Sequence, residues 1–366
     1  GTYVCGILVP RVGHIRCFTV FASLASAITL ILVIHVGPWT WIGARMAYGA
    51  CLAALYMVME SWLNLVAENR ERGQILSFYM LTVYIGIALS QGVISLAPPE
   101  SFTLFAVASV LLSLALIPVA ASRTPQPRKI STENFSLMEL IRTSRLATAG
   151  VFTTGMVNGS FWGLAPIYLS NIGMGNGQVG WFIAFQYIGG LVLQWPIGYL
   201  SDRVERRGII VILLLLSSAV SFYLYSMEYT TAYSSFLLFM GGAFFFGGVN
   251  STLHSLFIAH ANDFLKPGQV VKASGGLLAV HAMGAIIGPM LATLAVSTVG
   301  VSGLPFFTGV VAGLVFFFSL YRMIVGRTAP QHTKVWFVPI PRAGMLVLKL
   351  DPRRSDIKKD DKSAGV

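Results

Sequence analysis

The segment "LQWPIGYLSDRVERRGIIVIL" (193–213) sets a short charged stretch between two apolar runs. Its charged side chains are Asp202, Arg203, Glu205, Arg206 and Arg207. Either flank is apolar enough to lie in lipid, whereas five charges in six residues are not. The segment is therefore typical of a loop that joins two membrane-spanning helices.

The composition of the whole chain favours the same class of protein. Of 366 residues, 55% are hydrophobic and 11% are charged, and the mean hydropathy is +0.73. Soluble domains carry about 25% charged residues. Apolar stretches long enough to cross a bilayer recur along the chain. We expect an all-α polytopic membrane protein with spans at 17–36, 39–66, 73–96, 102–121, 147–170, 178–200, 208–226, 233–259, 269–298 and 303–325.

The basic residues predict the orientation of these spans. Of 25 Lys and Arg, 24 fall on one side, in alternate connections, at the span ends beside them or in the C-terminal tail, and the exception, Arg45, lies inside a span. This alternation follows the positive-inside rule, so we expect the basic connections and the C-terminus to be cytoplasmic. The net charge of +11 then reflects topology and contact with anionic lipid rather than a nucleic-acid partner.

The longest polar connection divides the chain into two groups of spans. We expect a first bundle over 1–121, a cytoplasmic connection over 122–146, a six-helix bundle over 147–325 and a cytoplasmic tail over 326–366. The first bundle has four spans and the end of a fifth. Two parallel six-helix repeats that lack the first helix and most of the second would give this arrangement.

An internal repeat supports that division. "GILVPRVGHIR" (6–16) aligns with "GYLSDRVERRG" (198–208) at an offset of 192 residues. The segment from Glu60 aligns with the segment from His254 at an offset of 194. Both matches fall at predicted cytoplasmic helix ends, which favours a true repeat over two similar loops.

Two motifs resemble those of a known transporter family. Residues 198–207 resemble the G-x-L-[AS]-D-R-x-G-R-[RK] loop signature of the major facilitator superfamily, and 45–49 resemble its R-x-x-x-G motif. The segments "QWPIGYLSD", "MESWLN" and "AHANDF" are similar to a YcaD-like bacterial branch. The loop has Glu205 where the signature has Gly, and its first-half copy has Pro10 where the signature has Asp. The resemblance implies the major facilitator fold in a bacterial inner membrane.

The resemblance also implies that the loop acts as a gate. Gly198 permits close helix contact, and the acidic and basic side chains can pair at neighbouring helix ends. We predict that Asp202, Arg206 and Asp263 form a charge cluster that holds the inner gate shut; the alternative is a solvated turn that only fixes topology. The predicted gating residues are Gly198, Asp202, Arg203, Arg206, Arg207 and Asp263.

Polar side chains inside spans are candidates for a substrate or proton pathway, because a charge at mid-bilayer costs on the order of 2.5–3.5 kcal/mol. Arg45 and Glu60 are nearly in phase on one helix, and His254 and His281 can titrate near neutral pH. Snorkelling, ion pairs and interhelical hydrogen bonds are the alternatives. By the resemblance, three spans line the cavity. The candidates are Arg45, Glu60, Asn158, Trp162, Asn250, His254 and His281.

The sequence holds no nucleophile–base spacing, phosphate-binding loop or metal-ligand motif, so we expect no enzymatic activity, no cofactor and no metal. We expect a monomeric secondary transporter that moves a small molecule by alternating access, with proton coupling as an open option. The alternatives are a non-transporting receptor or assembly protein on the same fold, or an inactive fragment. Gly284-x-x-x-Gly288-Pro289 is either a packing motif or a bending point.

Overall fold

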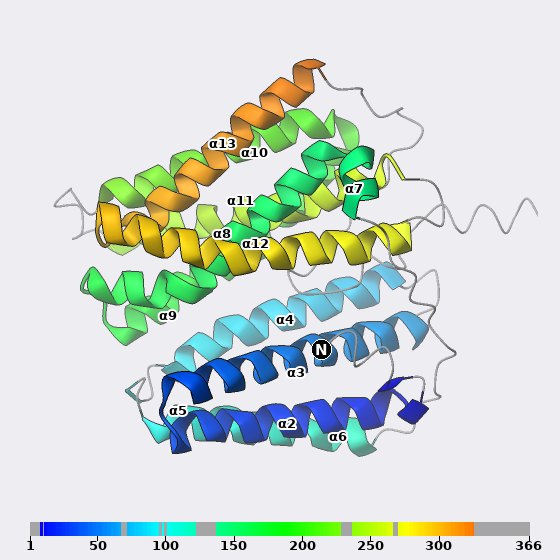
Figure 1. The fold of residues 1–366 in the computed structure, drawn as a ribbon, viewed down its shortest axis with the longest axis vertical. Coiled ribbons are helices and arrows are strands. Elements are labelled where there is room, and N and C mark those ends of the chain that lie inside the picture. Colours follow the sequence, from blue (N-terminus) through cyan, green and yellow to red (C-terminus); the bar gives the residue numbers. More distant parts are fainter. Residues whose placement is uncertain are drawn as a thin grey trace, which may run out of the picture. The chain divides into compact units, whose positions relative to one another are not determined.

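The computed structural model describes residues 8–9, 11–66, 72–94, 97–98, 101–121, 137–227, 236–265 and 270–325. Within these ranges every regular element is an α-helix (Figure 1). The chain forms two compact units: unit 1 includes the described parts of 8–80 and 93–121, and unit 2 those of 81–92 and 137–325. The predicted tail (326–366), residues 122–136 of the central connection and Pro10 lie outside the described residues.

Each predicted span coincides with helix. The helices are α2 (His14–Ile34), α3 (Pro38–Val66), α4 (Arg72–Ile94), α5 (Phe102–Leu114), α6 (Leu116–Ala121), α7 (Leu137–Thr143), α8 (Arg145–Asn171), α9 (Asn176–Arg203), α10 (Arg206–Ser226), α11 (Phe236–Asn262), α12 (Val270–Val299) and α13 (Gly303–Val325). The span at 102–121 is divided at Ala115 into α5 and α6. Pro118 has no N–H to donate to the carbonyl of Leu114, which explains the interruption one turn earlier.

Seven segments of the described helices are long and apolar enough to cross a membrane: α2, α3, α5 together with α6, α10, α11, α12 and α13. Helix α8 carries many Gly, Ser, Thr and Asn residues, which lower its hydropathy. It packs against α11, α12 and α13, so these side chains lie inside unit 2 rather than against lipid. Hydropathy therefore misses a helix whose buried faces are rich in small polar residues.

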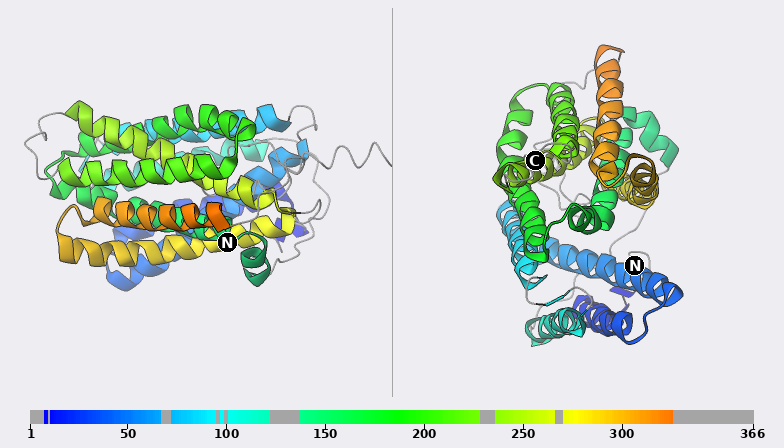
Figure 2. Two further views of the ribbon diagram at one scale, coloured as in Figure 1. Left: turned by 90° about the horizontal axis from the view of Figure 1, so that it is seen from above. Right: turned by 90° about the vertical axis from the view of Figure 1, so that its left-hand side faces the viewer.

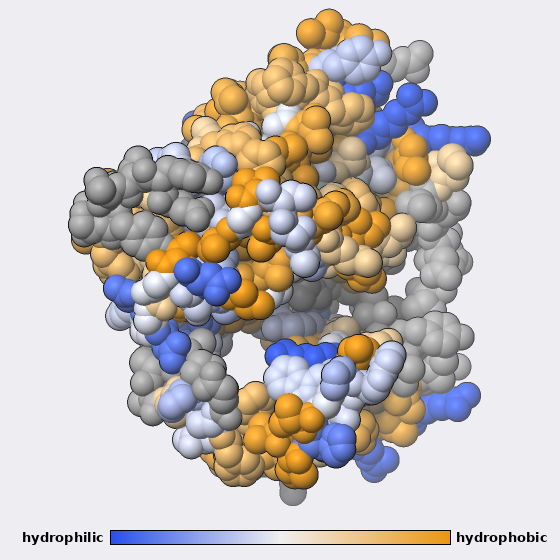
Figure 3. Space-filling view, turned by 60° about the vertical axis from the view of Figure 1, so that its left-hand side comes forward, coloured by the Kyte–Doolittle hydropathy of each residue, from blue (hydrophilic) through white to orange (hydrophobic). Residues whose placement is uncertain are grey.

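The surface is apolar where lipid would contact it. Large hydrophobic side chains are exposed on several helices, among them Leu237, Met290, Leu314, Phe317 and Ile324. Figure 3 shows apolar residues over much of the face that it presents. Such a surface is abnormal for a soluble protein and normal for one that is solvated by lipid chains.

Unit 1 is organised around α2, which packs against α3, α5 and α6. Its apolar contacts include Cys17, Ala25, Ala54 and Val58, all of them buried. Ser26 Oγ donates to the backbone carbonyl of Ser109 at 3.0 Å and joins α2 to α5. Small side chains and interhelical hydrogen bonds are how helices associate when lipid removes the hydrophobic advantage of packing.

Unit 2 is built from helix pairs that contact through glycine. In the pair α8 and α12, a Cβ on Gly155 would meet the carbonyl of His281, and a Cβ on Gly284 would meet the carbonyl of Phe152. In the pair α9 and α11, Gly189 lies against Phe244 and Gly247 against Gln186 in the same way. Figures 1 and 2 show these long helices side by side. Close packing thus accounts for Gly284 in the G-x-x-x-G motif without a bend.

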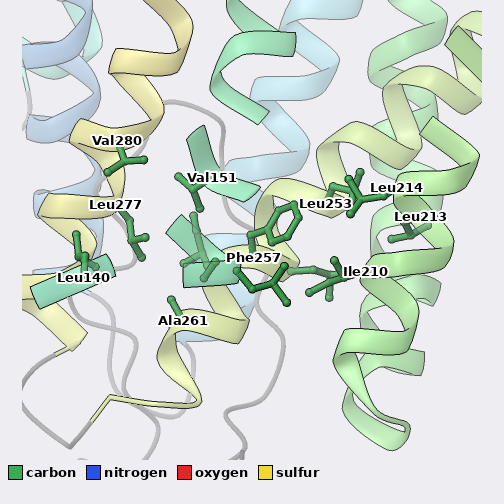
Figure 4. Packing of buried hydrophobic residues seen from close by; sticks show 14 of the residues in the cluster. Leu140, Val151, Ile210, Leu213, Leu214, Leu253, Phe257, Ala261, Leu277 and Val280 are labelled. Carbon is green, nitrogen blue, oxygen red and sulfur yellow. The ribbon is translucent and has the colours of Figure 1, made fainter. Parts of the chain in front are cut away.

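The apolar core of unit 2 lies near one end of these helices. Phe257 is fully buried at its centre, with Val151, Leu253 and Ile210 around it (Figure 4). A Cβ on Gly150 would enter the ring of Phe257, so α8 approaches α11 closely here. This packing holds the ends of α8, α10 and α11 in a fixed arrangement beneath the charged loop.

We predict that Gly284→Ala destabilises the protein, because the added methyl group meets the backbone of α8 at Phe152 and Met156. Overpacking of this kind costs about 1–3 kcal/mol. Gly275→Ala on the same helix is the matched control, since nothing lies within 4 Å of its Cβ position. Thermal unfolding in detergent should show a lowered midpoint for G284A alone, and equal midpoints for the two variants would contradict the packing argument.

Candidate functional site

The charged loop is a two-residue connection. Helix α9 ends at Arg203, Val204 and Glu205 are extended, and α10 begins at Arg206. The first two residues of α10 are therefore both cations, which the positive end of the helix dipole disfavours. Acidic partners offset this.

Arg206 is bound between two carboxylates. Its Nη1 donates to both oxygens of Asp263 at 2.8 and 2.7 Å, and its Nη2 donates to Asp202 Oδ1 at 3.0 Å. The Arg206 side chain is 2% exposed, and those of Asp263 and Asp202 are 2% and 11% exposed. We name these three residues the Arg206 cluster. It ties the end of α9 and the start of α10 to the end of α11.

The other loop charges lie outside this cluster. Arg207 pairs with Glu205 at 2.7 Å, and the Glu205 side chain is 52% exposed. Glu205, which stands where the loop signature has Gly, thus has a partner of its own. Arg203 stacks on the ring of Tyr199 at 4.2 Å. Gly198 is buried, and its carbonyl accepts a hydrogen bond from Ser201.

A row of polar and aromatic side chains follows one face of α8. Thr154, Asn158 and Trp162 are spaced four residues apart. Asn158 is 6% exposed, and its Nδ2 has no hydrogen-bond partner within the described part of the chain. Trp162 is 49% exposed, and its ring lies 5.4 Å from that of Tyr187 on α9. This face offers an amide donor beside an aromatic surface.

Ring contacts and then hydrogen bonds continue from that face across unit 2. The rings of Tyr187 and Tyr84 lie 5.8 Å apart. Tyr84 donates to Gln194 Oε1 at 3.4 Å, and Gln194 Nε2 donates to Ser255 Oγ at 2.7 Å. The sequence-based candidates omit all four residues. Gln194 and Tyr187 carry the signal of polarity inside a span, whereas nothing in the sequence links Tyr84 to residues 100 or more positions away.

Two histidines meet at the centre of unit 2. The rings of His254 on α11 and His281 on α12 have centroids 4.5 Å apart, and both residues are buried. Thr154 on α8 lies 3.1 Å from Nδ1 of His254. Asn250 is used differently, because its amide accepts from Ser217 and donates to the carbonyl of Phe246. The hydrogen bond from Ser217 shows that Asn250 joins α10 to α11.

The two charged candidates of unit 1 occupy different environments on α3. Arg45 is exposed, and its guanidinium lies 5.7 Å from the ring centre of Trp41. Glu60 is 2% exposed and lies beside Tyr56 and Tyr79. The structure therefore does not bring Arg45 and Glu60 together. Among the described residues, no group of three or more His, Cys, Asp or Glu side chains could hold a metal ion.

Comparison with known proteins identifies the family. The family model described as Major Facilitator Superfamily matches residues 1–175 and 147–353. The MFS-type transporter YcaD of Escherichia fergusonii is 29% identical over 294 residues, which cover 79% of this chain and 74% of the relative. The YcaD protein of Shigella flexneri serotype 5b is 27% identical over 299 residues, 80% of this chain and 75% of the relative.

The fold agrees with that of a solved transporter. A crystal structure of the Escherichia coli fucose:proton symporter FucP superposes with a TM-score of 0.51 at 12% identity, covering 87% of this chain and 86% of the symporter. This confirms the all-helical transporter fold that the loop signature predicts. A multi-pass chain with this loop, these helix pairs and these relatives belongs to the Major Facilitator Superfamily of membrane transporters.

Proposed function

We propose that the chain is a secondary active transporter that carries a small solute across the bacterial inner membrane by alternating access. The observation that carries the proposal is the Arg206 cluster, a buried arginine shared by two carboxylates at the ends of three helices. The basic connections and the C-terminus face the cytoplasm in this proposal, as the positive-inside pattern indicates.

The cluster suits a latch better than a structural clamp. Apolar side chains of similar size often stabilise a fold as well as a buried ion pair does, because desolvation offsets the attraction between the charges. Arg206 divides its donors between Asp202, in the last turn of α9, and Asp263, at the end of α11. Release of Asp202 changes the contact between α9 and α10, and release of Asp263 changes the contact between α10 and α11, in neither case by unfolding a helix. Such an arrangement allows two alternative states of the cytoplasmic ends of α9, α10 and α11.

The solute pathway in unit 2 is the face of α8 that carries Asn158 and Trp162. A buried amide and a half-exposed aromatic ring are typical of sites that bind small polar organic solutes. Proton coupling is part of the proposal, with Glu60, His254 and His281 as the buried ionisable groups. Asn250 belongs to helix contact in this account.

Alternating access predicts that one position on the pathway is reached from both sides of the membrane. We expect Trp162→Cys, with Cys5, Cys17 and Cys51 replaced by Ser, to react with a membrane-impermeant maleimide in both right-side-out and inside-out vesicles. Ser160→Cys is the matched control on the same helix; Ser160 is fully buried, so that variant should react in neither. Reaction of W162C from one side only would favour a receptor or an inactive chain instead.

If the Arg206 cluster is a latch, Asp202→Asn should shift the ratio of cytoplasmic to external labelling of W162C. Arg206 then loses one of its two carboxylates, so we expect faster reaction of W162C from the cytoplasmic side and slower reaction from outside. Glu205→Gln removes the same charge at the residue before α10 begins, at a side chain that is 52% exposed and pairs with the neighbouring Arg207 rather than with α9 or α11, and it should change little. An unchanged ratio for D202N in correctly inserted protein would contradict the gating role.

A further inference from the structure

The two buried imidazoles of unit 2 lie against each other. The ring centroids of His254 and His281 are 4.5 Å apart with 57° between the ring planes, and the residues are 3% and 7% exposed. His254 belongs to the helix pair α9 and α11, and His281 to the pair α8 and α12. The histidine pair therefore joins the two glycine-packed halves of this unit.

Thr154 favours one tautomer of His254. Its hydroxyl lies 3.0 Å from the carbonyl oxygen of Val151, to which it can only donate, and 3.1 Å from Nδ1 of His254. A hydroxyl has one proton to donate, so both hydrogen bonds are made together only when the imidazole donates from Nδ1. In that neutral tautomer the lone pair that takes a proton is on Nε2.

On α8 to α13 the charged side chains lie near the helix ends, whereas the two histidines lie further in. Every Asp, Glu, Lys and Arg on α8 to α13 lies in the first three or last four residues of its helix. From α8, Thr154 meets His254, and the next residue of α11, Ser255, accepts a hydrogen bond from the uncharged Gln194 of α9. Tyr187, near the middle of α9, is a further titratable side chain in the inner part of these described helices. Along the chain, His260 and Asp263 follow His254 by six and nine residues.

We propose that His254 and His281 form one proton-binding site that takes a single proton. The proton adds to Nε2 of His254 and the charge of the pair rises from zero to +1, while Nδ1–H stays with Thr154. A second proton is excluded, because two imidazolium rings in contact inside a protein repel strongly. Histidine is the side chain whose ordinary pKa lies nearest neutral pH, which makes the pair the best suited proton acceptor on the inner parts of these helices.

The proton site adds a coupling residue pair to the transport proposal, and only its role in coupling rests on that proposal. Proton binding follows from the geometry of the pair, whereas its use in coupling assumes that unit 2 moves during transport. Because the two rings belong to different helix pairs, a charge placed on them alters the contact between α11 and α12. Proton occupancy and helix arrangement are then linked.

Nuclear magnetic resonance of ¹⁵N-histidine-labelled full chain in lipid nanodiscs tests the site without a substrate. His254→Gln and His281→Gln assign the two rings, and spectra are recorded over about pH 4 to 9. We expect both rings to change at a single common midpoint with uptake of one proton in total. In each single variant the remaining ring should titrate alone, with its proton affinity changed by about tenfold or more.

Two further variants sharpen the result. Thr154→Val should alter the tautomer signal of His254 and leave the one-proton total, while His35→Gln, an exposed histidine of unit 1, should leave the pair unchanged. Independent midpoints, uptake of two protons, or no uptake over this range would overturn the proposal. One-sided labelling of W162C with an intact one-proton titration would instead contradict transport and leave the proton site standing.

Discussion

The buried guanidinium of Arg206 is the interaction on which the arrangement of the loop depends. Two residues separate α9 from α10, and the first residues of α10 are both cations. Without nearby carboxylates, the loop would place charge against the positive end of a helix and away from water. Asp202 and Asp263 satisfy that charge and at the same time connect the ends of α9, α10 and α11.

Close helix contact through glycine provides the rigid frame around the candidate sites. Gly155, Gly284, Gly189 and Gly247 let α8 meet α12 and α9 meet α11 at the level of the backbone. Contacts of this kind do not deform gradually, so relative movement is more easily accommodated between the pairs than within them. The histidine pair joins the two glycine-packed pairs, and the Arg206 cluster joins α10 to the pair of α9 and α11, which is where a change of state would act.

The sequence predicts the fold well because the physical signals that define it are local. Span length, charge alternation and the loop signature place the helices, and Asp263 follows from the internal repeat. The division at Ala115 depends on Pro118 and is visible only once the helix is built. The sequence also predicts neither the stacking of Arg203 on Tyr199 nor the pairing of Glu205 with Arg207.

The site is predicted less completely, because its contacts join distant segments. Polarity inside a span marks Asn158, His254 and Asn250 equally, yet the structure gives Asn250 two partners and leaves Nδ2 of Asn158 without one among the described residues. The contact between Tyr84 and Gln194 joins residues 110 positions apart, and no single segment contains the information for it.

The central claim is that the Arg206 cluster is a latch and not a structural requirement. Asp202→Asn, Arg206→Met and Asp263→Leu combined remove every charge of the cluster, so stability should stay near that of the wild type, whereas R206M alone should lose about 3–5 kcal/mol. Maleimide labelling of W162C from each side of the membrane then reads the latch directly. We predict that the triple variant reacts from the cytoplasmic side and hardly from outside. The wild-type ratio in a stable triple variant would contradict the account.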